Sequence, residues 1–136
     1  MPRALALLLP VLLLAGCAPS GGKGVDTGRF QGTSKDVAQA LSDLSDAARR
    51  KDGQRACAQL LSRRIVDALD KAGGCQKAMK NQFGDADVFT LDVKAVQVNG
   101  DQATARVSSD FNGDKREATI PLVRESGDWR VDQVGG

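Results

Sequence analysis

The stretch that decides the fold is FTLDVKAVQVNGDQATARVSSDF, residues 89–111, because its apolar residues recur at every second position on both sides of an Asn-Gly pair. Such alternation is typical of strands that bury one face. The apolar positions slip by one residue after Val93, which predicts a bulge near Ala95. Asn99-Gly100 is a preferred hairpin turn, so the stretch predicts two antiparallel strands.

The same pattern continues toward the C-terminus through two more turns. Asn112-Gly113 follows the second strand, and Ser126-Gly127-Asp128 separates a third strand from a last one that we expect over Trp129 to Val134. Pro121 predicts an edge or a bulge in the third strand, because proline has no backbone N–H. Three successive hairpins predict a four-stranded antiparallel meander. The residues expected to share its buried face are Phe89, Leu91, Val93, Ala103, Ala105, Val107, Ala118, Ile120 and Leu122.

Three helical patterns precede the strands. The first is capped by Thr33 or Ser34 and ends near Asp52-Gly53, the second covers residues 54–71, and the third covers residues 75–83. Helices followed by strands, each with one apolar face, predict an α+β domain with its short helices on one face of the sheet. The inward positions of the first two helices are Val37, Leu41, Leu44, Ala48, Cys57, Leu60, Leu61, Ile65, Ala68 and Leu69.

The N-terminal residues predict that the protein is located outside the cytoplasm. Ala4 to Ala15 is an apolar run of twelve residues, too short to span a bilayer. It ends in Leu14-Ala15-Gly16-Cys17, which resembles the lipobox of bacterial lipoproteins. This resemblance implies that residues 1–16 are a signal peptide and that Cys17 carries acyl chains such as palmitate, which hold the protein at the extracytoplasmic side of the cell membrane. The alternative is a secretory signal with an incidental cysteine.

The Gly-rich residues after Cys17 show no apolar period up to position 33. They predict a flexible tether, residues 17–33, on which Phe30 is the one large apolar residue and can dock on the domain. The expected organisation is therefore a signal peptide, a lipidated tether and one domain over residues 34–136.

With Cys17 lipidated, Cys57 and Cys75 are left as a pair in an oxidising compartment, where a disulfide persists. In one straight helix over residues 54–71, Cys57 would lie about 20 Å from the helix end. Bridged Cα atoms must come within roughly 7 Å of each other, and the few connecting residues reach only about 10 to 14 Å. We therefore predict a break in the helix within two residues of Ser62, which can cap a new helix. The alternative is an unbroken helix with two free thiols.

Composition excludes several classes of function. After removal of residues 1–16, 18 Lys and Arg face 17 Asp and Glu, and the short basic runs at 49–51 and 63–64 are expected to be solvated, so we expect no nucleic-acid partner. The chain has no His and no Tyr, so only a carboxylate mechanism remains among acid–base enzymes. Strand residues Asp92, Asp110 and Asp132 are candidates, but we expect Asp92 and Asp132 on the solvent face. We expect no metal and no cofactor, since the Asp110–Asp114 loop lacks the residues of a calcium site.

The domain resembles the nuclear-transport-factor-2-like (NTF2-like) superfamily, and specifically its small lipoproteins in actinobacteria and related lineages. The segments that carry the resemblance are Ala56–Ser62, Gly74–Ala78, Val98–Ala103 and Glu125–Asp132. The resemblance implies a curved sheet wrapped on helices as a cone with an apolar cavity. The residues expected in the core, or else lining such a pocket, are Phe89, Leu91, Phe111, Ile120 and Trp129.

Together these features predict a lipid-anchored, non-catalytic domain. Two binding roles remain open: a small apolar ligand, or another envelope protein that docks through the sheet face. The alternatives are a carboxylate-dependent isomerase or hydrolase and a structural component of the envelope. An enclosed cavity containing a strand Asp would favour the enzyme, and a cavity lined only by apolar residues would favour ligand carriage. A filled core with an exposed apolar patch on the sheet would favour a protein partner.

Overall fold

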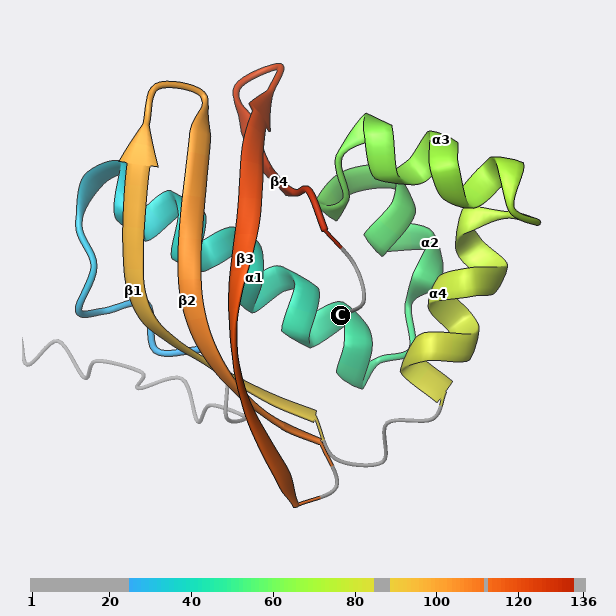
Figure 1. Cartoon of the computed structure of the whole chain (residues 1–136), viewed down its shortest axis with the longest axis horizontal. Helices are drawn as coiled ribbons and strands as arrows, with labels where there is room; N and C mark the ends of the chain where they lie inside the picture. The colour runs from blue at the N-terminus through green and yellow to red at the C-terminus, as the bar shows by residue number, and fades with distance from the viewer. Residues whose placement is uncertain (1–24, 85–88, 112, 134–136) are drawn as a thin grey trace, which may run out of the picture.

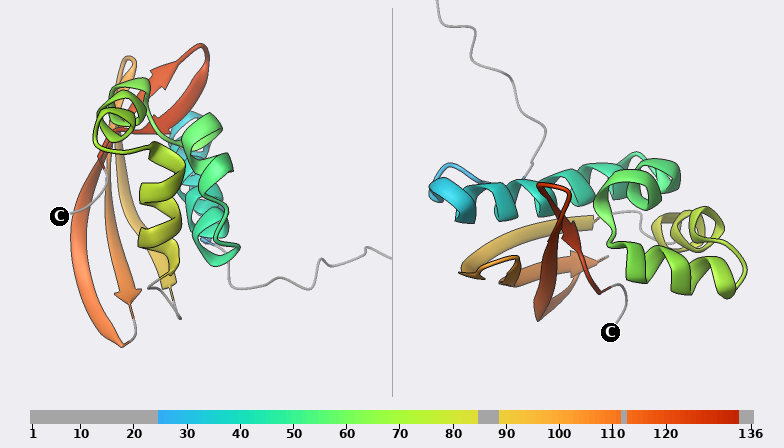
Figure 2. Two further views of the ribbon diagram at one scale, coloured as in Figure 1. Left: turned by 90° about the vertical axis from the view of Figure 1, so that its right-hand side faces the viewer. Right: turned by 90° about the horizontal axis from the view of Figure 1, so that it is seen from above.

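The computed structural model describes residues 25–84, 89–111 and 113–133, and it has an α+β architecture as predicted (Figure 1). Figures 1 and 2 show α1 lying across one face of a curved sheet, with the shorter helices gathered at the end beside β4. No helix among the described residues is long and apolar enough to cross a membrane. The elements are α1 (Gly32–Arg49), α2 (Gly53–Arg55), the π-helical turn η1 (Ala56–Leu60), α3 (Arg63–Lys71), α4 (Cys75–Gly84), β1 (Phe89–Asn99), β2 (Gln102–Phe111), β3 (Asp114–Glu125) and β4 (Asp128–Val131).

The sheet is the predicted antiparallel meander in the order β1-β2-β3-β4. Its register shifts between Val93 and Ala95, which confirms the bulge. The carbonyl of Pro121 accepts a hydrogen bond from the N–H of Asp132 at 2.8 Å, so the nitrogen side of Pro121 faces the end of β4. The absence of an N–H at Pro121 therefore removes no hydrogen bond between β2 and β3. The strand β4 ends at Val131, earlier than predicted, and Val134 lies outside the described residues.

The core lies between α1 and the sheet. Ala118 is an exception to the predicted inward face, since it is exposed on the part of β3 that extends beyond α1 and β4. The apolar stripe of α1, alternate residues of the strands and Met79 of α4 supply core side chains with almost no exposed surface. Those of α1 and the strands include Val37, Leu41, Val93, Val107, Leu122 and Val131.

The packed domain begins earlier than the sequence predicted. Val25 is only 9% exposed and belongs to the core, and Phe30 packs against the core as expected. The cap prediction at Thr33 or Ser34 is wrong, because α1 starts at Gly32, which adopts a φ of +57° that glycine tolerates without steric cost. Seven residues, 18–24, therefore separate Cys17 from the first core residue.

The predicted break at Ser62 is confirmed. The turn η1 ends at Leu60, Leu61 is extended and pairs with Val131, and Ser62 caps α3. The reversal brings Cys57 and Cys75 into a disulfide with their Cα atoms 6.1 Å apart. A bridge across 18 residues stabilises a domain by about 3 kcal/mol in the chain-entropy model. Ala68 is exposed, contrary to the expected inward position, because α3 turns mainly Ile65 toward the core.

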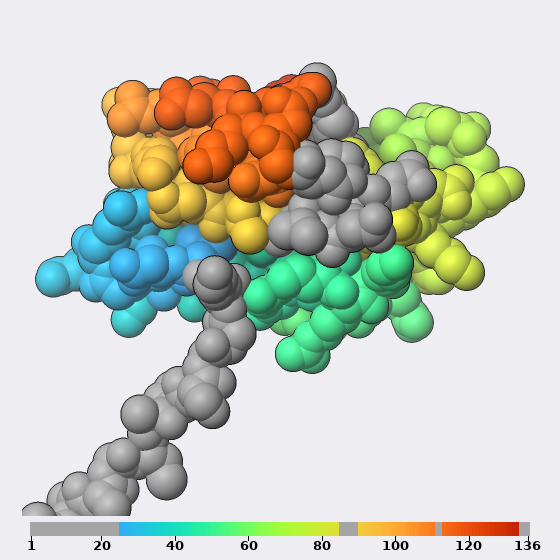
Figure 3. Space-filling model, turned by 90° about the horizontal axis from the view of Figure 1, so that it is seen from below, coloured from blue at the N-terminus to red at the C-terminus, as the bar shows by residue number. Residues whose placement is uncertain are grey.

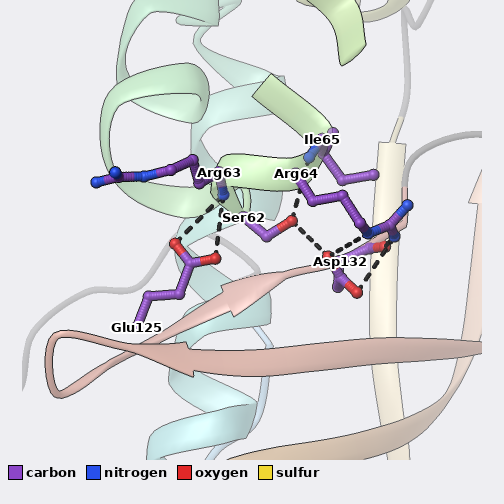
Figure 4. A network of polar contacts seen from close by, with 6 residues as sticks. All are labelled: Ser62, Arg63, Arg64, Ile65, Glu125 and Asp132. Atoms are coloured by element: carbon purple, nitrogen blue, oxygen red, sulfur yellow. Dashed lines mark hydrogen bonds and ion pairs between the residues drawn. The ribbon is translucent and has the colours of Figure 1, made fainter. Parts of the chain in front are cut away.

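Ser62 is completely buried and ties the helices to the sheet (Figure 4). Its N–H donates to the carbonyl of Val131 at 2.9 Å, its Oγ accepts from the N–H of Ile65 at 3.3 Å, and the hydroxyl donates to Asp132. Glu125, at the end of β3, accepts the N–H of Arg63 with both carboxylate oxygens, at 3.1 and 3.2 Å. The start of α3 is thus held by the residues that flank β4. The negative carboxylate of Glu125 also interacts favourably with the positive N-terminal end of the dipole of α3.

We expect Ser62→Ala to lower the free energy of unfolding by about 1 to 2 kcal/mol, because it removes a helix cap and leaves Asp132 without its buried donor. Urea unfolding followed by circular dichroism measures the change.

Ser34→Ala is the matched control, because Ser34 makes no cap and its loss should change the free energy of unfolding by less than about 0.5 kcal/mol. Equal effects of the two substitutions would contradict the role assigned to Ser62.

Candidate functional site

A groove of about 440 Å³ lies between α1 and the β3–β4 hairpin, and we call it the hairpin groove. Asp36, Gln39 and Asp43 of α1 line one wall. Their spacing of three and four residues places them on one side of the helix, away from the buried Val37 and Leu41. The amphipathic pattern that buries one face of α1 therefore presents carboxylates and an amide to the groove.

The opposite wall is an aromatic side chain with a cation over it. Trp129 is 7% exposed, so it is mainly a core residue, and it also lines the hairpin groove. The guanidinium carbon of Arg124 lies 5.2 Å from the centre of its ring, a cation–π contact. Arg124 also forms an ion pair with Asp101 at 3.1 Å, which holds the guanidinium in place.

Two further arginines complete the hairpin groove. Arg55 faces Asp43 across it, with nitrogen and oxygen 3.7 Å apart. Arg130 donates to the carbonyl of Ala58 at 3.2 Å, while its buried Nε has no hydrogen-bond partner among the described residues and lies 3.8 Å from Glu125. The groove thus offers both signs of charge beside an aromatic ring, a surface suited to a polar ligand with charged groups.

Two other hollows are formed by the described residues. One, of about 550 Å³, lies on the other side of Arg130, between Cys57, Val66 and Glu125. The second, of about 580 Å³, lies on the outer sheet face beside Pro121. Both are open to solvent. The described core side chains between α1 and the sheet have almost no exposed surface, and all three hollows open to solvent.

The five residues predicted for the core or a pocket have different environments in the structure. Trp129 is both buried and in the hairpin groove. Leu91 and Ile120 are half-buried against the core and line none of the three hollows. Phe89 and Phe111 are opposite each other in the β1–β2 register, and their side chains lie outside the described part of the structure.

The three strand carboxylates all have local partners. Asp92 is about half exposed and pairs with Lys94 and Arg29. The hydrogen bond from the Lys94 ammonium lowers the pKa of Asp92 by more than partial burial raises it, and the charges of Lys94 and Arg29 lower it further. Asp110 accepts the N–H of Gly113 at 2.8 Å, which is turn chemistry as expected.

Asp132 lies on the outer side of the sheet, where it lines the hollow beside Pro121, but it is less exposed than expected. Its side chain is 20% exposed and accepts from Ser62 and from Arg64, whose Nε lies 3.2 Å away. The start of α3 therefore covers much of this carboxylate. The described acidic and cysteine residues form no group that could hold a metal ion.

The outer face of the sheet is polar. Val98, at 36%, is the one large apolar side chain that is exposed among the described residues. A partner that docked on this face would therefore meet polar and charged groups instead of an apolar patch. The exposed residues of this face include Gln97, Thr104, Arg106, Glu117 and Thr119.

Comparisons with known proteins confirm the fold. No family model and no curated protein matches the sequence. The structure is similar to a candidate dehydratase of the NTF2-like family from Streptomyces avermitilis, with a TM-score of 0.55 and 15% identity over 73% of this chain and 90% of that one. An NTF2-like protein of unknown function from Shewanella baltica has a TM-score of 0.46 and 15% identity over 71% and 85% of the two chains. The Streptomyces likeness shows that the chain has an NTF2-like fold.

We expect Asp92 to titrate below the ordinary range for an aspartate, and Lys94→Ala to raise its pKa toward that range. Because the folded-state pKa is lowered, the stability that Asp92 contributes is present above its unfolded pKa and is lost as the pH falls through the folded pKa. Carboxyl chemical shifts followed against pH measure both values.

Lys115→Ala is the control, since Lys115 is an exposed lysine of the same sheet that forms no recorded contact with Asp92. An Asp92 pKa raised toward neutrality would contradict the structural role and restore the residue as a candidate general base.

Proposed function

We propose that this chain is a lipid-anchored, non-catalytic binding domain on the extracytoplasmic side of the cell membrane, and that its hairpin groove binds a polar segment of another envelope protein. The observation that carries the binding role is the groove itself, in which Trp129, Arg124 and the carboxylates of α1 face one another. An open groove with charged walls suits a polypeptide better than it suits a small apolar molecule, which favours an enclosed apolar pocket.

The cysteines support the anchor. Cys57 and Cys75 bond to each other, so Cys17 is the one cysteine left for another role. A disulfide also fits an oxidising compartment, which agrees with export. The apolar run that ends in Leu14-Ala15-Gly16-Cys17 supplies the resemblance to a lipobox.

The strand carboxylates support a non-catalytic role. The Streptomyces protein is a candidate dehydratase. A dehydratase needs a group that takes up and releases a proton in contact with substrate. Here Asp92, Asp110 and Asp132 are each held by neighbouring residues of the chain. The lowered pKa of Asp92 also makes it a weaker base, which is the wrong direction for proton abstraction near neutral pH.

Intact-mass measurement of the protein extracted from its own membrane tests the anchor. We expect a chain that begins at Cys17 and carries acyl chains, and we expect Cys17→Ala to abolish processing and acylation. An intact Met1 or an unmodified thiol at position 17 would refute the proposed lipid anchor.

Photocrosslinking in the native membrane tests the groove. We expect a photoreactive residue at Gln39, on the groove wall, to capture an envelope protein, whereas the same residue at Gln97, on the outer sheet face, captures none. Arg124→Met should reduce the Gln39 product severalfold because it removes the cation over Trp129, while Arg106→Met on the outer face should leave it unchanged.

Capture from Gln97 alone would instead favour docking through the sheet face. Capture from Gln39 that survives Arg124→Met would show that the Trp129–Arg124 pair does not contribute to binding.

A further inference from the structure

The charges of this chain are strongly divided between its two structural parts. Residues 49–84, which hold the short helices, contain nine Lys and Arg and three Asp. Residues 85–136, which hold the sheet, contain six Lys and Arg and ten Asp and Glu. The near-neutral total therefore conceals a helical end with a net charge of +6 and a sheet with a net charge of −4. The short basic runs of the sequence did not reveal this division.

A close contact between α2 and α4 gathers the helical cations. A Cβ atom at Gly53 would lie 3.0 Å from the carbonyl oxygen of Gln76 and 3.2 Å from the nitrogen of Lys80, so the chain after α1 lies directly against α4. Figure 3 shows α4 and this segment together at the end of the molecule opposite the first described residues. The contact places the end of α1 beside α4, and we call the four exposed cations there the basic cluster: Arg50, Lys51, Lys77 and Lys80.

The neighbouring carboxylates are engaged within the chain. Asp46 pairs with the side chain of Arg49. Asp52 accepts the N–H of Arg55 at 2.9 Å and Asp70 accepts the N–H of Cys75 at 2.8 Å, so both of these carboxylates interact with helix N-termini. The basic cluster therefore keeps a net positive field toward solvent.

We propose that the basic cluster contacts anionic lipid headgroups of the membrane to which the chain is anchored. This inference rests on the proposed lipid anchor for its choice of partner. Each Lys or Arg near an anionic bilayer surface strengthens binding about fivefold, and one anchor combined with a basic surface holds a protein more firmly than either alone. The acidic sheet is repelled by the same surface, so the charges also fix which end of the domain faces the lipid.

The short tether makes this contact possible. A Gly-rich sequence of seven residues, such as residues 18–24, has an expected r.m.s. reach of about 13 to 16 Å. Surface potentials decay over about 8 Å at physiological ionic strength, so a domain held this close spends much of its time within the field of the headgroups. Because α1 is about 27 Å long and the tether extends to about 25 Å, the cluster reaches the surface with α1 lying along the membrane.

Lysine footprinting of the mature acylated protein tests the contact. The protein is inserted in vesicles of phosphatidylcholine, with or without about a third of phosphatidylglycerol, and exposed briefly to an acetylating reagent. We expect Lys51, Lys77 and Lys80 to react severalfold more slowly on the anionic vesicles and to recover at high salt. Lys94 and Lys115 lie on the sheet, outside the cluster, and should react equally on both, as internal controls.

Matched variants isolate the charges. We expect Lys51→Gln with Lys77→Gln and Lys80→Gln to abolish the slowing of amide hydrogen exchange in α4 that anionic vesicles produce. The combination Lys94→Gln, Arg106→Gln and Lys115→Gln, all on the sheet, makes the same change in net charge and should preserve that slowing.

Equal reactivity of the three cluster lysines and the two sheet lysines on both kinds of vesicle would overturn the proposal. So would protection of the cluster by a short DNA duplex in solution without protection on anionic vesicles, which would assign it to another polyanion. Flotation with phosphatidylcholine vesicles alone reports the lipid anchor. If the chain fails to float, the anchor is refuted separately, and its lysine reactivity with added anionic vesicles still decides whether the cluster binds lipid.

Discussion

The hydrogen bonds of Ser62 with β4 are the constraint on which the arrangement of the helices depends. The backbone of Ser62 donates to Val131, and its hydroxyl meets Asp132, so the chain cannot continue the helix that begins at Gly53. It must turn, and the turn sends α3 and α4 back beside α2. The disulfide between Cys57 and Cys75 can close only after this reversal. The contact of Gly53 with α4, and with it the basic cluster, follows from the same turn.

Local patterns were enough to predict most of the fold. The alternation on both sides of Asn99-Gly100 predicted the paired strands and the bulge, because side-chain direction in a strand depends on the backbone alone. The break at Ser62 followed from chain length and disulfide geometry. The docking of Val25 could not be predicted, since one apolar residue in a Gly-rich stretch has no period. The low exposure of Asp132 was not predicted, because its side chain meets the start of α3, seventy residues away in the sequence.

The hairpin groove illustrates why a site is harder to predict than a fold. Trp129 was recognised as a core or pocket residue, and Arg124 lies opposite it in the predicted β3–β4 hairpin. The opposite wall at Asp43 belongs to α1, which meets this hairpin only in the tertiary structure. A signal did exist in α1, where Asp36, Gln39 and Asp43 recur at helical spacing opposite the apolar stripe. Such a polar face is also what any solvated helix shows, so the pattern alone does not distinguish a groove wall from an ordinary surface.

The proposed binding surfaces lie beside the packed layer between α1 and the sheet. Leu41, Val93 and Val107 lie in that layer with almost no exposed surface, whereas the hairpin groove and the basic cluster present charged groups at its edge. Contacts between exposed charges are individually weak and screened by salt. The proposed lipid anchor would offset this weakness, because a membrane-bound chain has a high effective concentration beside the membrane and beside other membrane-bound proteins. Under that proposal, neither the hairpin groove nor the basic cluster requires high intrinsic affinity.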